Sequence, residues 1–512
     1  MKKLILILIT LTGLVGCQSN SKSKITIKCQ EDVKVGSVID INGESFKVVD
    51  EIMLREMIAN NDDITFVCTS KITDMSDMFN GSTFNGDISN WDVSSVTGMR
   101  GMFNGSTFNE DISNWDVSSV TDMRGMFSNS TFNGDVSNWD VSSVTDMGYM
   151  FNTSTFNGDV LNWDVSSVTY MSGLFEYSEF DGDISRWDVS SVTDMSGLFF
   201  YSKFNGDVSN WDVSSVTDMR VMFSNSKFNG DVSRWDVSSV TDMGEMFSES
   251  SFNGVISNWD VSSVTDMRGM FSNSTFNGDV SKWDVSSVTD MTDMFSKSKL
   301  NGDVSNWDVS RVTNMSGMFF NVVFNQPIGD WDVSNVTDMS GMFNGSTFNG
   351  DISNWDVSNV TNMSYMFSES SFNGVISNWD VSSVTNMGEM FENSKFDGDV
   401  SKWVNPVINN NKSFCKKVAM DYLNNLNLSN IYWLSDLDYK WGSCQGNDLS
   451  DFSTIADKPN QYQYCGRVQK FHNGQYWSYD IVVFIEQDYN GECKATGTWD
   501  NLNGNGFELT EL

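Results

Sequence analysis

The sequence is poor in histidine and in basic residues, and each shortage excludes a class of function. Its 512 residues include a single histidine, His472. A zinc site or a histidine-based catalytic site needs a cluster of such ligands, so we expect neither. The 31 basic side chains are outnumbered by 68 acidic ones, which gives a formal net charge of −37 at pH 7. A nucleic acid would be repelled by this charge, so we expect no nucleic-acid partner.

The first 17 residues have the pattern of a targeting segment. They read MKKLILILITLTGLVGC, in which two lysines precede an apolar run that ends in small residues. This pattern is typical of a secretory signal and is too short for an ordinary membrane span. Residues 18–24 are polar and rich in serine and lysine, which predicts a flexible tether.

The end of this segment, Leu14-Val15-Gly16-Cys17, resembles the bacterial lipobox. The resemblance implies that Cys17 becomes the N-terminus and carries acyl chains that anchor the protein in a membrane. Position 18 is not an aspartate. By the enterobacterial sorting pattern this implies the outer membrane, or the cell membrane if the host is Gram-positive. The alternative is a simple signal peptide with an incidental cysteine.

Six further cysteines are compatible with disulfide bonds on the export side of a membrane. Cys29 and Cys68 bracket the segment before the repeats and are expected to pair. The other four lie beyond the repeats and allow three pairings that sequence does not rank: Cys415, Cys444, Cys465 and Cys493.

A 24-residue phrase repeats without insertion or deletion through most of the chain. One copy, residues 120–143, reads VTDMRGMFSNSTFNGDVSNWDVSS, and its tryptophan recurs at every step of 24 from Trp91 to Trp403. Unbroken repeats of this length predict a solenoid, in which each turn buries its apolar side against its neighbours. We therefore expect a signal peptide with lipobox (1–17), a tether (18–24), an N-terminal cap (25–71), a solenoid of fourteen repeats (72–407), a helical C-terminal cap (408–430) and a small antiparallel β module (431–512).

Within one repeat the pattern predicts one helical turn and one strand. Thr145 and Asp146 offer an N-cap, so residues 147–151 are expected to form a single helical or 3₁₀ turn. Residues 159–163 are short with a β-branched centre and are the strand candidate. Gly158 is expected to permit a sharp bend between them.

Stacked repeats would place like residues over like residues. Asn157 and its equivalents are expected to form an internal ladder that bonds turn backbone. Asp135, Asp140 and Asp146, with their counterparts, would form columns of carboxylates, and such like charges repel. We expect these oxygens to cap turn amides; the alternative is bridging by calcium, which takes oxygen ligands. No other cofactor is expected.

The two ends of the repeat array have their own patterns. Before it, residues 25–50 predict two or three short strands, residues 51–60 a helix and residues 64–68 a strand. Beyond it, the sequence predicts an amphipathic helix at 413–426 and strands at 463–471, 476–487 and 493–498. The β module is either a binding head or a lid.

The positions that vary between repeats surround the phrase Met-x-x-Met-Phe, and they are the candidate binding surface. Tyr177 and Tyr201 occupy the same slot one repeat apart and are expected to stack. Exposed aromatic residues are typical interface anchors. The alternative is sequence drift on a solvated face. The candidate residues are Tyr170, Tyr177, Phe200 and Tyr201.

The phrase V-T-x-M-x-x-M-F-x-x-S-x-F-N-x-x-[IV]-x-x-W-D-V-S resembles the BspA-like surface-protein repeats, the DUF285 type of leucine-rich repeat. The resemblance implies a leucine-rich-repeat-like, right-handed parallel β-solenoid on a bacterial surface. Some members are implicated in attachment to host matrix proteins or other cells. The family transfers no catalytic residues, so we expect no enzyme.

These patterns together favour a lipid-anchored surface protein that acts as an adhesin or as a scaffold for protein or glycan binding. Its partner would be a host matrix protein, a glycan or another cell surface. The alternatives are an envelope spacer without a specific ligand, a carbohydrate-active β-helix enzyme, and ice binding through the threonine column.

Overall fold

The computed structural model describes residues 26–400, Trp403 and five strands beyond it. The elements before the repeats are β1 (Val38–Ile41), β2 (Glu44–Val48), α1 (Glu51–Ala59) and β3 (Val67–Cys68). Those after the repeats are β4 (Ile431–Trp433), β5 (Asp438–Tyr439), β6 (Gln461–His472), β7 (Gln475–Gln487) and β8 (Cys493–Asp500).

The N-terminal segment is a small sheet with one helix beside it. Strands β1 and β2 pair antiparallel around Asn42 and Gly43, and both turn residues have positive φ, as a tight hairpin requires. Strand β3 adds to β2 in parallel. Helix α1 begins where the Asp50 side chain accepts a hydrogen bond from the Met53 N–H at 2.9 Å. The predicted helix and the first two strands of this segment are confirmed, and the strand expected at 64–68 is shorter, at Val67–Cys68.

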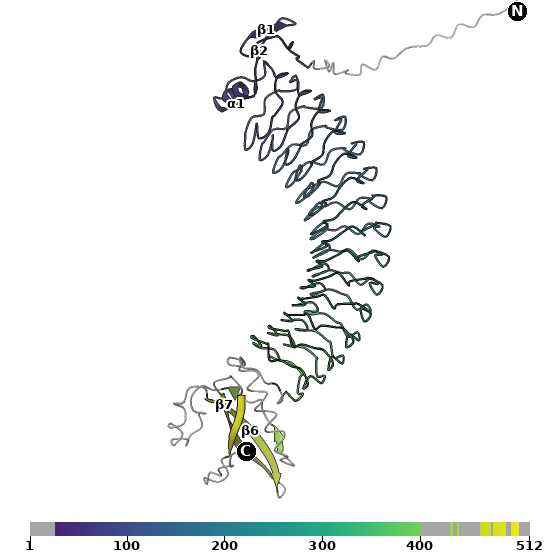
Figure 1. Ribbon diagram of the computed structural model, residues 1–512. Coiled ribbons are helices and arrows are strands. Elements are labelled where there is room, and N and C mark those ends of the chain that lie inside the picture. Colours follow the sequence, from purple (N-terminus) through teal and green to yellow (C-terminus); the bar gives the residue numbers. More distant parts are fainter. Residues whose placement is uncertain are drawn as a thin grey trace, which may run out of the picture.

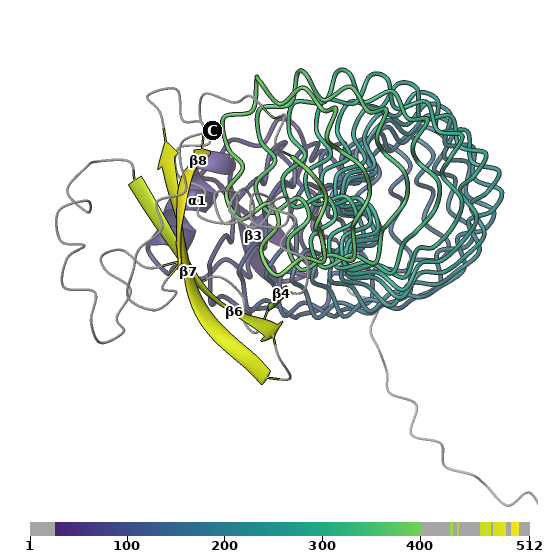
Figure 2. The same cartoon turned by 90° about the horizontal axis from the view of Figure 1, so that it is seen from below.

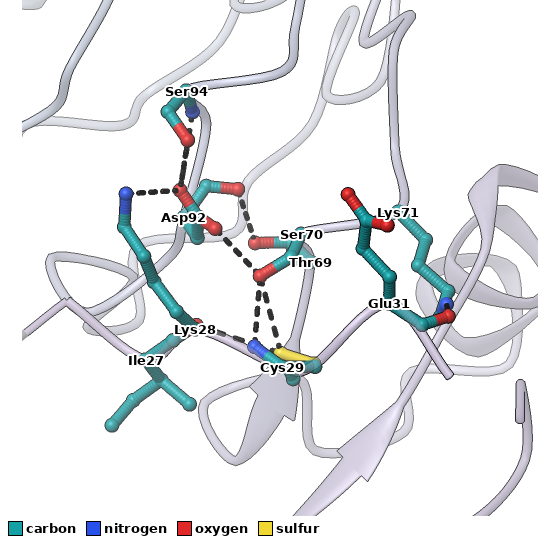
Figure 3. The surroundings of a disulfide bond; sticks show 10 residues. Ile27, Lys28, Cys29, Glu31, Thr69, Ser70, Lys71, Asp92 and Ser94 are labelled. Atoms are coloured by element: carbon teal, nitrogen blue, oxygen red, sulfur yellow. Dashed lines mark hydrogen bonds and ion pairs between the residues drawn. A yellow bond between two sulfur atoms is a disulfide. The ribbon is translucent and has the colours of Figure 1, made fainter. Parts of the chain in front are cut away.

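A disulfide and a buried carboxylate fasten this segment to the first repeat (Figure 3). Cys29 and Cys68 are bonded, as expected. The Ser70 hydroxyl donates to Asp92 Oδ2 at 2.6 Å, and Lys28 Nζ lies 3.9 Å from Asp92 Oδ1. Asp92 is buried, whereas its equivalent one repeat later, Asp116, is exposed. The segment thus covers the apolar end of the first repeat.

Successive repeats lie directly on one another as coils of a long curved rod (Figure 1). Equivalent residues form parallel bridges from Asp74 to Asn386, and backbone groups such as Thr145 N and Thr121 O bond one repeat apart at 2.9 Å. Seen from below, the coils nearly overlap in projection (Figure 2). Each repeat packs against the next in the same way, and this requires a 24-residue period without insertions.

The interior is a set of side-chain columns. Phe151 stacks on Phe175 with ring centroids 5.8 Å apart, and Trp163 stacks on Trp187 at 6.4 Å. Each repeat tryptophan from Trp115 to Trp403 donates its indole N–H to a backbone carbonyl of the preceding repeat, as Trp163 does to Val136 O at 3.0 Å, and Trp91 donates to Ile64 O of the N-terminal segment. The bulky rings are therefore buried without leaving a polar group unsatisfied.

The spacing of equivalent atoms shows which side of the coil lies inside the bend. Neighbouring hydrogen-bonded backbones lie about 4.8 Å apart, and the stacked rings of Tyr177 and Tyr201 are 4.9 Å apart. The tryptophan column is more widely spaced, at 6.4 Å. The stacked coils form an arc (Figure 1). Because columns on the outer side of an arc are spaced more widely than those on its inner side, we infer that the tryptophans lie on the outer side and the bridge column with the Met-x-x-Met-Phe phrase on the inner side.

Two predictions for the single repeat are wrong. Residues 159–163 form no strand but an extended piece and a turn, and the inter-repeat bridge is at Asp146 instead. Residues 147–151 form no helical or 3₁₀ turn. A left-handed residue, Tyr149, interrupts them, and the N–H groups of Met147, Tyr149 and Phe151 bond to the next repeat. Val160 is buried in the core, and a buried valine gives the same β-branched signal as a strand.

Two further expectations are corrected in detail. The asparagine ladder exists, with Asn133 Oδ1 accepting from the Asn157 N–H at 2.9 Å, but Asn157 is exposed and the ladder is on the surface. Gly158 does not need a positive φ. A Cβ there would meet the Phe156 ring at 2.8 Å, so glycine leaves room for the ring.

Beyond the repeats, the strands form an antiparallel sheet in the order β4-β6-β7-β8, with β5 also paired to β6. Strands β6, β7 and β8 correspond to the three strands predicted there. The expected helix within 408–430, the signal segment with Cys17, the tether, and the pairing of Cys415, Cys444, Cys465 and Cys493 lie outside what the structure describes.

Candidate functional site: the inner side of the arc

The backbone of the inner side alternates between two kinds of hydrogen bond. Met147 N, Tyr149 N and Phe151 N donate to carbonyl oxygens of the next repeat at 2.8–3.0 Å. The residues between them close tight turns inside the repeat, as Met150 N does onto Met147 O at 3.1 Å. The backbone that carries these side chains is therefore held by hydrogen bonds both to the next repeat and within its own repeat.

Two positions in each repeat have left-handed backbone, four residues apart. Tyr149 and Thr153 are one such pair, with φ of 56° and 52°. Glycine, asparagine and aspartate suit this conformation, and several repeats carry them there, but others carry tyrosine, valine or glutamate. The Met and Phe of the Met-x-x-Met-Phe phrase are buried in most repeats, whereas Phe200, just before the left-handed Tyr201, is half-buried. The left-handed residues face solvent or the neighbouring turn.

Tyr177, Phe200 and Tyr201 form an aromatic patch. The tyrosine rings stack at 4.9 Å with 14° between their planes, as predicted. Phe200 packs edge-on against both, at 5.2 Å from Tyr177 and 5.0 Å from Tyr201. Each tyrosine is 49% exposed. Aromatic side chains with two rotatable bonds offer a large contact area at a low entropic cost.

Tyr170 is not part of this patch. It is half-buried in the bridge column, and its ring covers Gly148, where a Cβ would meet it at 2.7 Å. The guanidinium of Arg124 lies 5.5 Å from the Tyr170 ring and 5.8 Å from the Tyr149 ring, which are cation–π distances. Tyr170 therefore joins Arg124 and Tyr149 in a second cluster on the same side.

A groove of about 310 Å³ lies next to the aromatic patch. Its size is at the low end of the roughly 300–1,000 Å³ typical of small-ligand sites. The sequence pattern did not single out its small residues, although serine and glycine in the same two slots of consecutive repeats are the signal that could have located it. The lining residues are Tyr149, Ser172, Glu176, Ser196, Gly197, Arg220, Val221, Gly244, Glu245 and Arg268.

The arginines of the groove are already paired. Arg220 Nη2 lies 2.7 Å from Asp218 Oδ2, and its Nε lies 3.3 Å from Asp242 Oδ2. Arg268 contacts two aspartates of the bridge column in the same way. These contacts raise the pKa of both guanidinium groups, with the hydrogen bond that each donates to its nearer aspartate as the largest cause. The groove therefore offers little uncompensated positive charge.

Glu176 is the half-buried carboxylate of the groove. Burial raises its pKa, and a hydrogen bond from Asn152 Nδ2 to its Oε2 at 3.0 Å opposes this shift. Glu176 Oε2 and the Tyr149 ring lie over the same residue, Gly173, where a Cβ would meet them at 2.9 Å and 2.5 Å. An acceptor oxygen and an aromatic ring are thus held side by side.

The aspartate columns bond to turn amides, as expected. Asp140 Oδ1 accepts from the Ser142 N–H at 3.1 Å and from its hydroxyl at 2.6 Å, and Asp146 Oδ1 accepts from the Gly148 N–H at 2.8 Å. Among the described residues, no group of three or more histidine, cysteine, aspartate or glutamate side chains is placed to hold a metal ion. Within the same part of the chain, no helix has the length and apolar character of a membrane span.

Comparison with known proteins gives one family. A family model described as "Mycoplasma protein of unknown function, DUF285" matches residues 51–157, 152–253, 224–323, 248–346 and 320–428, which together cover 51–428 without a gap. The search of curated proteins gave no match, and neither did the search of solved structures. The matched length is well over half of the chain, and it includes every residue of the groove and of the aromatic patch. The chain is therefore a repeat protein that belongs to the DUF285 family.

Proposed function

We propose that this protein is a lipid-anchored bacterial surface protein that attaches to a partner through the inner side of its arc. It would act as an adhesin or as a binding scaffold for a host matrix protein, a glycan or another cell surface. Cys17 would carry the lipid. In this proposal the stack of repeats is a right-handed, leucine-rich-repeat-like parallel solenoid of the BspA-like type, and its role involves no catalysis.

One observation carries the proposal: exposed variation between repeats collects on the inner side. The outer corner keeps Trp-Asp-Val-Ser in nearly every repeat, while the inner left-handed slots change from glycine to tyrosine, glutamate, lysine and valine. A protein that served only as an envelope spacer would need only the constant Trp-Asp-Val-Ser corner. Solvent-facing aromatic residues on rigid backbone, such as Tyr177 and Tyr201, support attachment because they can be buried by a partner with little loss of entropy.

The test is attachment of beads coated with the full chain to immobilised matrix proteins, glycans and bacterial cells. The variant Tyr177→Asn, Phe200→Ser, Tyr201→Asn removes the aromatic patch with residues that already occupy the same slots at Asn129, Ser128 and Asn225. We expect attachment to fall about tenfold or more, while the thermal unfolding curve keeps its midpoint.

A matched control alters the same two slots elsewhere. Lys297 and Phe320 contact each other at 5.3 Å, far along the rod from the patch. The variant Lys297→Asn, Phe320→Ser should attach like the unaltered protein. If the unaltered chain attaches to none of the surfaces, the envelope-spacer alternative is the better reading. Equal losses in the two variants would also count against a binding role of the patch.

A further inference from the structure

The groove has an open floor because two consecutive repeats carry small residues in the same slots. Ser172 and Ser196 occupy one slot, and their hydroxyl groups are 2.8 Å apart. Gly173 and Gly197 occupy the next slot. A Cβ on Gly197 would lie 3.7 Å from Val221 Cγ2, an ordinary van der Waals contact, so this slot has room for a side chain. Gly173, in contrast, is covered by Tyr149 and Glu176.

The walls of this space combine one aromatic face with hydrogen-bonding groups. Tyr149 lines the groove, with its hydroxyl 3.4 Å from Ser172 Oγ. Glu176, Arg220 and Glu245 also line it. The Tyr149 backbone has φ of 56° and is bonded to Ser172 O at 2.8 Å, which fixes the base of its side chain before any ligand arrives.

We propose that this groove is a binding site for a neutral oligosaccharide, with Tyr149 packing against a sugar ring and Glu176 accepting hydrogen bonds from its hydroxyl groups. The hydroxyls of Ser172 and Ser196 already bond to each other, and Ser196 Oγ donates to Asp194 Oδ1 at 2.6 Å, so the serines form the floor of the groove. A pyranose has one apolar C–H face and a rim of hydroxyls that both donate and accept. An aromatic face beside a carboxylate is complementary to that pattern. The proposal rests on the proposed attachment function, because it names the ligand class of the same side of the arc.

Charge argues against an acidic sugar. Arg220 and Arg268 are each shared between two aspartates, and Arg124 is directed to Tyr149 and Tyr170. Glu176 and Glu245 add negative charge to the groove, and the chain as a whole has a net charge of −37. A sulfated or sialylated glycan would therefore meet net repulsion.

Size argues for a short glycan rather than a protein surface. The space is about 310 Å³. A stable protein interface buries about 800 Å² on each partner, mostly over flat surface. A small concave site that combines an aromatic ring with polar side chains is instead suited to a small polar ligand.

The test measures binding of neutral oligosaccharides to the full chain by a glycan array and by titration of the best-bound sugar, with sulfated and sialylated forms alongside. Gly197→Tyr fills the groove with a residue that the same slot holds at Tyr149 and Tyr365. Its matched control is Gly341→Tyr, since Gly341 has the same φ of 61° and open space above it. Tyr149→Gly removes the aromatic face, and Tyr365→Gly is its control.

We expect Gly197→Tyr and Tyr149→Gly each to weaken neutral-sugar binding about tenfold or more, and both controls to bind like the unaltered chain. If Gly197→Tyr or Tyr149→Gly loses sugar binding and its control does not, the result supports the site. A change in stability does not alter this conclusion, because the control carries the same substitution in an equivalent slot. The proposal is overturned if the chain binds no neutral oligosaccharide, if acidic forms bind better, or if variants and controls bind alike. Attachment of coated beads to matrix proteins alone would overturn this proposal and leave the attachment function standing.

Discussion

At the scale of single residues, the environment of each aspartate decides whether its charge helps or harms folding. Asp140 is exposed, and hydrogen bonds from Ser142 lower the pKa of its carboxyl group, with the side-chain bond as the largest cause. Asp146 accepts a similar bond from Gly148, yet burial raises its pKa, and the neighbouring Asp122 adds to the rise. Two aspartates of one repeat therefore have opposite effects on stability as pH changes.

Asp146→Asn is expected to stabilise the protein at pH 7. Because the folded-state pKa is raised, the ionised carboxylate destabilises the folded protein at pH values above that pKa. At pH values below the ordinary pKa of 3.8 it has no such effect. Asparagine keeps the turn, since Asn362 Oδ1 accepts from the Ser364 N–H in the same slot. The gain should be less than about 1 kcal/mol, because the group is only partly buried, and it should vanish near pH 3 in denaturant titrations.

Asp140→Asn is the control with the opposite sign. A lowered pKa contributes stability that is present above the ordinary value of 3.8 and is lost as pH falls through the folded-state value. This substitution should therefore give no gain at pH 7. If both variants showed the same pH dependence, the assigned difference in burial between the two carboxylates would be wrong.

At the scale of the repeating element, the inner turn segment has strained backbone at the positions that carry its variable side chains. Tyr149, Thr153, Val221 and Glu245 all have positive φ where glycine or asparagine would fit without cost. For a β-branched residue this conformation is strained by about 1 kcal/mol or more. The inter-repeat hydrogen bonds hold the conformation in place, so the residue in each slot can vary while the turn stays the same.

Thr153→Asn is expected to raise the free energy of unfolding by about 0.5–1 kcal/mol. Asparagine tolerates the left-handed region and already occupies this slot at Asn129, Asn225 and Asn273. The control is Thr155→Asn, two residues on in the same repeat, where the backbone does not have positive φ. Urea unfolding of both variants checks the prediction, and a gain at Thr155 equal to that at Thr153 would contradict it.

At the scale of the whole molecule, the rod is an array in which each repeat contacts its immediate neighbours. Its curvature follows from the difference between the spacing of 4.9 Å at Tyr177 and Tyr201 and that of 6.4 Å at the tryptophans. Bulky indole rings on one side and backbone hydrogen bonds on the other produce this difference. The bend places the groove and the aromatic patch on a concave surface.

Deletion of one whole repeat, residues 336–359, should leave a folded rod that is shorter by about 5 Å. Asn335 would then join Val360, which restores the 24-residue phase. Deletion of the half repeat 336–347 removes that phase and should unfold the array on both sides of the junction. Small-angle scattering measures the length, and circular dichroism measures the folding. Equal stability of the two deletions would show that stacking in register is not required.

The sequence by itself determined the repeat, its length, the buried columns and the stacking of Tyr177 on Tyr201, because an exact period forces equivalent residues into equivalent positions. It also located the Cys29–Cys68 pair and strands β6 to β8. Tertiary structure alone decided which segment makes the inter-repeat bridge. Backbone hydrogen bonding leaves little trace in side-chain composition, so residues 159–163 gave the signal of a strand while Asp146 makes the bridge.

Tertiary structure also decided where the groove lies and how Tyr170 is used. A cavity forms where small residues of neighbouring repeats meet, as at Ser172 and Ser196. Neither serine stands out when its repeat is considered alone. The ring of Tyr170 turns towards Gly148 and Arg124 instead of joining Tyr177. Such placements depend on distances between repeats, and those distances are fixed by how the coils pack and bend, which no single copy of the phrase encodes.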